Sequence, residues 1–169
     1  MMLPAPAVGD VRRDAASLLG RILGDADGSR LYWALVETGL AEEAVAQYDG
    51  HDGLGVTLVY CSCGPEQAAE VERIARAELS RCIETLDEAE VERAKQKFAT
   101  ASTVAGELPA GRMRRLGSLW TYFGAYRSLE EEIERITAVT LDELRALAAD
   151  YPLEPVVTGR LRPADQAAA

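Results

Sequence analysis

Apolar residues recur at every third or fourth position over residues 11–23, which is the spacing of one face of an α-helix. The polar segment 24–30, GDADGSR, interrupts this pattern with two glycines and two aspartates. Bulky apolar residues resume at Leu31, and we predict a second helix that is capped by Ser29 and ends at Gly39. The front of the chain is therefore expected to form two helices joined by a polar loop.

The pattern changes to strict alternation over residues 54–63, which predicts a β-strand. Apolar residues occupy both faces of this strand, so we expect it to lie in the centre of a sheet. Residues 41–48 predict a weaker, more polar strand, and the segment 49–53, DGHDG, predicts the hairpin loop between the two. Because the loop is short, the two strands should pair antiparallel.

The second half of the chain is predicted to be mainly helical, with helices near 65–83, 86–105, 107–123, 129–138 and 141–150. Three of them are expected to open with capping boxes, in which Ser or Thr is followed three residues later by Glu: Thr85 with Glu88, Ser128 with Glu131, and Thr140 with Glu143. Residues 156–161 predict a closing strand.

This order of elements indicates an α+β fold, a small and mainly antiparallel sheet covered by helices. We expect residues 11–160 to form a single α+β domain and residues 161–169 to form a flexible tail. Three strands make a thin sheet for so many helices, which suggests that the first strand is missing. Residues 1–10 are then an N-terminal lead, with at most the remnant of that strand.

Composition narrows the range of partners. Eighteen Lys and Arg residues against twenty-eight Asp and Glu residues give a net charge of −10, which repels the phosphates of nucleic acid. No apolar run is long enough to span a bilayer, and the first residues do not resemble a secretory signal. We therefore expect no nucleic-acid partner and no membrane association. Three cysteines suit a reducing compartment, so we expect a cytoplasmic location.

Candidate catalytic groups are scarce in this sequence. It contains one histidine, His51, whereas a zinc site of the H-x-x-E-H type needs two imidazoles one helical turn apart. Cys61 and Cys63 lie on one face of the predicted strand, with only His51 or Cys82 available to complete a metal site. Buried small apolar side chains are the better interpretation of these cysteines. We therefore predict no catalytic residue, no metal ligands and no cofactor on this chain.

Five segments in order resemble the pitrilysin/insulinase family of zinc peptidases: Ile22-Leu-Gly-Asp-Ala-Asp-Gly-Ser-Arg-Leu31, Gly39-Leu40, Asp52-Gly53, Glu90-Val-Glu-Arg-Ala-Lys95 and Ile136-Thr-Ala-Val-Thr140. The resemblance covers about residues 11–160 and is to the domain that carries no metal. It implies the fold of the pitrilysin and mitochondrial-processing-peptidase domains. In such proteins a zinc domain with an H-x-x-E-H helix faces this second domain, and the two close around a peptide.

The resemblance also implies where peptide contacts would lie. Active members carry an Arg in the helix after Ser-Arg-Leu and a Tyr shortly after Gly-Leu, both directed at the substrate backbone. This chain has Val36 and Glu42 at those positions. Arg30 or Tyr48 could substitute, so the candidate peptide-binding residues are Arg30, Glu42 and Tyr48.

Three functions remain open at this point. The leading one is the non-catalytic C-terminal half of a zinc peptidase, forming the peptide-enclosing wall opposite the zinc domain. The rival is an inactive structural domain of the same fold, and the third is an independent small enzyme. The first predicts a metal-bearing domain as partner, on the same full-length chain or on a separate subunit, with zinc bound only there. A domain without its partner exposes an apolar face or strand edge, so a homodimer is also expected.

Overall fold

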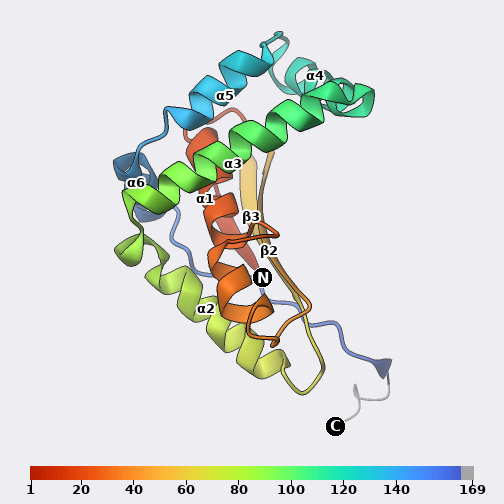
Figure 1. Cartoon of the computed structure of the whole chain (residues 1–169), viewed down its shortest axis with the longest axis vertical. Coiled ribbons are helices and arrows are strands. Elements are labelled where there is room, and N and C mark those ends of the chain that lie inside the picture. Colours follow the sequence, from red (N-terminus) through yellow and green to blue (C-terminus); the bar gives the residue numbers. More distant parts are fainter. Residues whose placement is uncertain (165–169) are drawn as a thin grey trace.

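The computed structural model describes residues 1–164, in which one antiparallel sheet is covered on one face by helices (Figure 1). The strands are β1 (Met2–Ala5), β2 (Glu43–His51) and β3 (Leu54–Ser62), in the order β1-β3-β2. The α+β class, the antiparallel pairing and the central position of the 54–63 strand are therefore confirmed. No helix among the described residues is long and apolar enough to cross a membrane.

The hairpin between β2 and β3 is tighter than the sequence predicts. Strand pairing continues to His51 opposite Leu54, so only Asp52 and Gly53 form the turn. Gly53 has φ +77°, a left-handed backbone conformation that glycine adopts without strain. The predicted five-residue loop 49–53 is therefore wrong, because its first three residues extend β2.

The front of the sheet also differs from the prediction. Residues 2–5 form a genuine strand, with Met2 opposite Leu58 and Ala5 opposite Gly55 on β3. The first strand that the sequence analysis expected to be missing is thus present over four residues, inside the segment predicted to be a lead. Two prolines hid it, since proline lacks the N–H of a regular ladder and is tolerated mainly on edge strands such as this one.

The predicted closing strand 156–161 does not form. A single bridge remains, in which the Met2 amide donates to the Val157 carbonyl at 2.9 Å and the Val156 amide donates to the Met2 carbonyl at 2.9 Å. Leu161 is fully exposed, so this segment buries no side chain that would reward further pairing. Residues 161–164 of the predicted tail are exposed, and residues 165–169 lie outside the described part of the chain.

Helix α1 (Arg13–Gly24) is the centre of the core. It lies between the sheet and an outer layer of helices, so apolar residues surround most of its circumference (Figure 1). On its sheet side, Gly20 and Gly24 allow the helix backbone to approach β2. A Cβ atom at Gly24 would lie only 1.9 Å from the Ala46 nitrogen, so no larger residue fits there.

The remaining elements are η1 (Tyr32–Val36), a π-helical turn, and the helices α2 (Ala68–Thr85), α3 (Glu88–Glu107), α4 (Pro109–Phe123), α5 (Leu129–Thr137) and α6 (Leu141–Asp150). Ser29 accepts a hydrogen bond from the Tyr32 amide, and the chain turns at Gly39 with φ +74°, as predicted. The capping boxes at Ser128 and Thr140 are confirmed. The one at Thr85 is wrong, because Asp87 caps α3 instead.

The contact between α1 and β2 gives a prediction for stability. Gly24→Ala should lower the free energy of unfolding by about 1 to 3 kcal/mol, since the added methyl group collides with the β2 backbone. Gly117→Ala in α4 is the matched control: nothing lies within 4 Å of a Cβ there, and the helix should gain up to about 1 kcal/mol. Urea unfolding measures both; equal midpoints for Gly24→Ala and the wild type would contradict this packing.

Candidate functional site

The described residues do not fit a zinc site. His51 lies at the hairpin with 53% of its side chain exposed, and its Nε2 is 3.2 Å from Asp49 Oδ2. Burial raises the pKa of Cys61 to about 11 and that of Cys82 to about 12, which disfavours the thiolates that zinc binds. Within residues 1–164, no three His, Cys, Asp or Glu side chains are grouped so that they could hold a metal ion.

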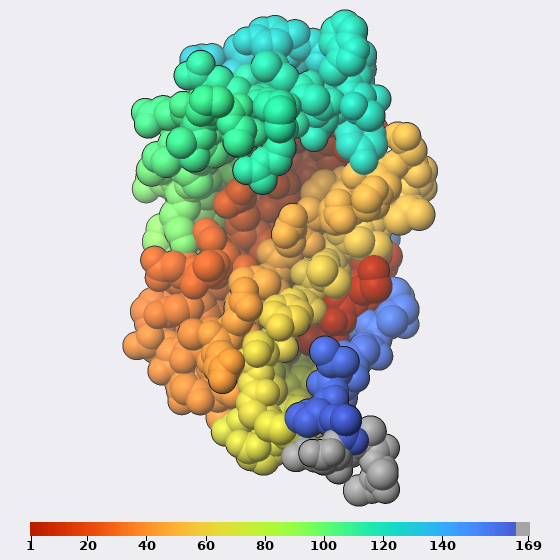
Figure 2. Space-filling model, turned by 90° about the vertical axis from the view of Figure 1, so that its right-hand side faces the viewer, coloured from red at the N-terminus to blue at the C-terminus, as the bar shows by residue number. Residues whose placement is uncertain are grey.

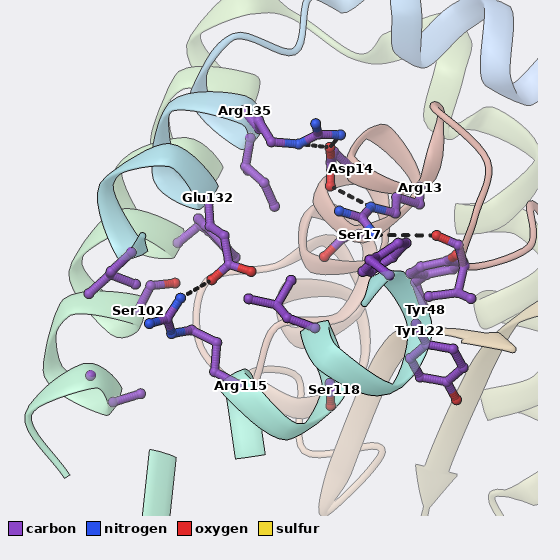
Figure 3. A pocket seen from close by; sticks show the side chains of 18 of the residues that line it. Arg13, Asp14, Ser17, Tyr48, Ser102, Arg115, Ser118, Tyr122, Glu132 and Arg135 are labelled. Carbon is purple, nitrogen blue, oxygen red and sulfur yellow. Dashed lines mark hydrogen bonds and ion pairs between the residues drawn. The ribbon is translucent and has the colours of Figure 1, made fainter. Parts of the chain in front are cut away.

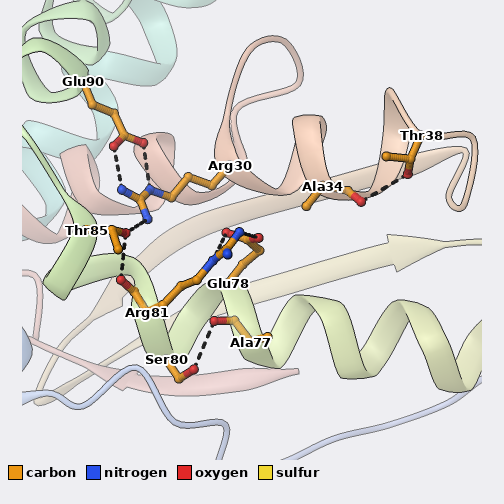
Figure 4. Close-up of polar contacts among 9 residues, drawn as sticks. All are labelled: Arg30, Ala34, Thr38, Ala77, Glu78, Ser80, Arg81, Thr85 and Glu90. Carbon is orange, nitrogen blue, oxygen red and sulfur yellow. Dashed lines mark hydrogen bonds and ion pairs between the residues drawn. The ribbon is translucent and has the colours of Figure 1, made fainter.

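Arg30 connects the segment before η1 to the corner between α2 and α3 (Figure 4). Its Nε and Nη2 donate to the two carboxylate oxygens of Glu90 at 2.8 and 2.7 Å, and its Nη1 donates to Thr85 Oγ1 at 2.6 Å. Only 12% of the Arg30 side chain is exposed. The hydrogen bonds that Arg30 donates to Glu90 raise the pKa of Arg30, and all three guanidinium nitrogens are used in holding the fold together.

Glu42 and Tyr48 are separated by six residues along an extended segment, roughly 20 Å at the usual rise of a strand. Glu42 is exposed at the start of the sheet, and Val36 is half-buried in η1. Tyr48 is half-buried at the other end of β2, where its hydroxyl donates to the Pro6 carbonyl at 2.8 Å. The three candidate peptide-binding residues therefore do not converge on one place.

The face of the sheet opposite the helices is uncovered. Its β1 and β3 residues are mainly apolar, whereas β2 contributes mainly polar residues there, such as Glu43, Gln47 and Asp49. Its most exposed large side chains are Met2, Leu54, Leu58 and Tyr60, with 38, 57, 45 and 50% of their surfaces accessible, and we call them the open sheet face. Met2 stands opposite Leu58 in the β1–β3 register, and the other three alternate along β3. Figure 2 views the molecule from this side, with the strands running across the front and α4 above their end.

A cavity of about 410 Å³ opens between the N-terminal half of α1 and helices α3, α4 and α5. Figure 2 shows it as a hollow between α4 and the end of β2, on the same side as the open sheet face. Its walls are mainly apolar and aromatic, and include Tyr48, Phe98, Leu119, Phe123 and Ile136. The cavity therefore contains one of the predicted residues, Tyr48, together with groups that the sequence analysis did not single out.

Two ionic groups on the cavity wall join helices that are distant in sequence (Figure 3). Arg135 of α5 donates to Asp14 of α1 at 2.6 Å, and Arg13 lies 3.3 Å from the same carboxylate. On another part of the wall, Arg115 of α4 donates to Glu132 of α5 at 3.0 Å and to the Arg127 carbonyl at 2.9 Å. These pairs fix α4 and α5 over the end of α1 and so keep the cavity open.

Comparison with known proteins agrees with this architecture. Residues 1–98 match the family model described as the peptidase M16 inactive domain. An uncharacterized zinc protease of Streptomyces coelicolor is 32% identical over 150 residues, which are 88% of this chain and 33% of that protein. The chain therefore spans about a third of the length of the curated relatives it matches.

Solved structures share the fold. The peptidase M16 inactive domain from Pseudomonas fluorescens superposes with a TM-score of 0.74 at 19% identity, covering 89% of this chain and 37% of that one. A chain of complex III2 from Candida albicans gives a TM-score of 0.79 at 17% identity, covering 89% of this chain and 38% of that one. At such identities the likeness concerns the fold alone.

The role of Arg30 can be tested through stability. Arg30→Lys should lower the free energy of unfolding by about 1 to 2 kcal/mol, because lysine cannot make the two parallel hydrogen bonds to Glu90. Arg73→Lys is the control, since Arg73 makes the same kind of pair with Glu70 but is 65% exposed, and should cost less than about 0.5 kcal/mol. Equal losses in urea unfolding would show that the Arg30 pair is no more than a surface contact.

Tyr48 gives a pH-dependent prediction. Burial raises its pKa from 10.0 to about 12, so its neutral form contributes stability that is complete below pH 10 and lost as the pH rises through 12. Tyr48→Phe should cost about 1 kcal/mol at pH 7 through the hydrogen bond to Pro6, and this difference should shrink above pH 10. Urea unfolding over a pH series measures it; a difference that does not change with pH would contradict the assignment.

Proposed function

Because the chain belongs to the peptidase M16 inactive-domain family, we propose that it is the non-catalytic half of a two-domain zinc peptidase, which packs against a metal-bearing domain and encloses a peptide. The observation that carries this proposal is the open sheet face, an apolar surface on a domain whose described residues assemble no metal site. A soluble monomer seldom leaves a contiguous apolar patch of this kind exposed to water.

The greater length of the matched relatives supports a partner domain. The matched relatives are zinc proteases about three times as long as the aligned region, so in those proteins this domain stands beside further chain. The zinc and its ligands would come from that other part, on the same chain or on a separate subunit. In this arrangement, the chain described here supplies surface and rigidity, and water is excluded from the reaction when the two domains close.

The free edge of β2 is suited to binding an extended peptide. β2 is the outer strand on one edge, so part of its backbone has no strand partner within the described residues. An extended peptide can pair with such an edge through main-chain hydrogen bonds, which depend little on sequence. Glu42 directly precedes this edge strand and Tyr48 lies in its second half, and both remain candidates for peptide contact, whereas Arg30 would have to leave Glu90 first.

A second candidate function is a purely structural domain. It is favoured by the engagement of Arg30 with Glu90 and Thr85, which leaves no arginine free to contact a peptide at that position. Under this alternative the open sheet face still binds a second domain, but no hydrolysis results. A zinc domain with an H-x-x-E-H helix, encoded in the same or a neighbouring reading frame, would favour the peptidase.

The test is reconstitution with the metal-bearing M16 domain of the same genome. The two polypeptides, purified separately, should form a one-to-one complex by titration calorimetry, and a quenched fluorescent peptide should be cleaved only by the mixture. Leu58→Asp should weaken binding by at least about tenfold, because it would bury a charge in the interface. If the complex forms without hydrolysis, the structural alternative is correct.

The control is Val11→Asp, which makes the same change at a residue that is 85% exposed and lies before α1, away from the sheet. It should bind the partner as tightly as the wild type.

In the chain alone, the open sheet face would pair with a second copy, and Leu58→Asp should then shift the homodimer to monomer in sedimentation. A cytoplasmic location fits this scheme and stays a prediction.

A further inference from the structure

The cavity between α1, α3, α4 and α5 has an excess of positive charge. Its walls carry three arginines, Arg13, Arg115 and Arg135, and two carboxylates, Asp14 and Glu132. A fourth arginine, Arg127, stacks on the wall residue Phe123. In a chain of net charge −10, cations therefore exceed anions by two around one apolar cavity.

Phe123 brings two of these arginines together. The Cζ atom of Arg13 lies 4.2 Å from the centre of the Phe123 ring, and that of Arg127 lies 5.0 Å from it. Burial lowers the pKa of Arg13, and repulsion from Arg127 and Arg135 adds to this effect despite the nearby Asp14. The Phe123 ring thus holds the guanidinium groups of Arg13 and Arg127 close to each other. These two cations repel each other, and a bound anion would reduce that repulsion.

Two buried guanidinium donors, one on the cavity wall and one beside it, have no hydrogen-bond partner among the described residues. They are Nε of Arg115 and Nη1 of Arg127, and both atoms are buried. A buried donor without a partner costs free energy, so such atoms commonly mark the place of a ligand or an ordered water. Arg115 lines the cavity and is held in position by Glu132 and by the Arg127 carbonyl, whereas Arg127 itself is not a lining residue.

From this geometry we infer that the cavity binds a monocarboxylate with an apolar body. The carboxylate would be held by the guanidinium group of Arg115, which lines the cavity. The body would lie against Phe98, Leu119 and Ile136. A volume of 410 Å³ is within the range of small-ligand pockets and accommodates about a dozen non-hydrogen atoms. One negative charge suits the site, since Asp14 and Glu132 would repel a second.

Two sources could supply this chemistry: the C-terminal residue of a peptide with an apolar side chain, or a free acid such as a medium-chain fatty acid. The cavity opens on the side of the open sheet face, where the proposed function places a peptide (Figure 2). The inference does not depend on that function, because the cavity and its charges belong to this chain alone.

The experiment is titration calorimetry of the full chain with four probes. Octanoate and N-acetyl-leucyl-phenylalanine carry the carboxylate, whereas octanol and N-acetyl-leucyl-phenylalanine amide are their neutral counterparts. At least one acid should bind at least about tenfold more tightly than its neutral counterpart, since the guanidinium donors would remain unpaired with the neutral probe. The tighter acid identifies the source.

Three variants locate the binding. Arg115→Gln removes the anchoring charge and should lower the affinity for the preferred acid by at least about tenfold. Arg114→Gln removes an exposed charge from the same helix and should change that affinity by less than about twofold. Ser102→Phe fills the cavity from α3 without removing a charge and should also weaken binding by at least about tenfold. Circular dichroism of each variant checks that it is folded.

The outcomes are distinct. Acid-selective binding that is lost in Arg115→Gln and Ser102→Phe supports the site. Equal binding of acids and neutral probes, no binding of either acid, or acid binding that survives Ser102→Phe would overturn it. None of these readouts uses the metal-bearing domain, so failure here and failure of the proposed peptidase role can be told apart.

Discussion

The structure depends on the close contact between α1 and β2. Gly20 and Gly24 stand one helical turn apart on the same face of α1, where a Cβ atom would lie 3.2 Å from the Tyr48 nitrogen and 1.9 Å from the Ala46 nitrogen, respectively. Without side chains at these positions the helix backbone rests directly on the strand. The opposite face of α1 then carries the outer helices, so the orientation of α1 determines where α3, α5 and α6 can pack.

The surfaces available for function follow from this arrangement. All the helices that cover the sheet lie on one side, so the other side keeps its apolar residues exposed unless another domain covers them (Figure 1). The first turns of α1 present Arg13 and Asp14 at the end of the sheet, where Arg135 ties α5 to them. The cavity and the open sheet face thus adjoin because a single helix positions both.

The sequence revealed those parts of the fold that have a local cause. Alternation over residues 54–63 indicated the central strand, and the Ser128 and Thr140 capping boxes located the starts of α5 and α6, because each signal lies within a few residues. The short strand Met2–Ala5 depends on pairing with β3 some fifty residues away, and with Pro4 inside it the strand gave no local sign of itself. Gly24 was interpreted as a break in the pattern, whereas it is a place where the α1 backbone approaches β2 so closely that no side chain fits.

The candidate site was harder to predict, because its residues lie far apart in the sequence. Its charged groups come from positions as far apart as Arg13 and Arg135, and no spacing in the sequence relates them. Arg30 was proposed as a peptide contact from its place in a motif, but the sequence could not show that Glu90, sixty residues later, holds its guanidinium. Where an arginine is held in this way, its position in a motif reflects packing as much as chemistry. Backbone edges and apolar surfaces can bind a partner or peptide while tolerating substitution, and so they leave little trace in a single sequence.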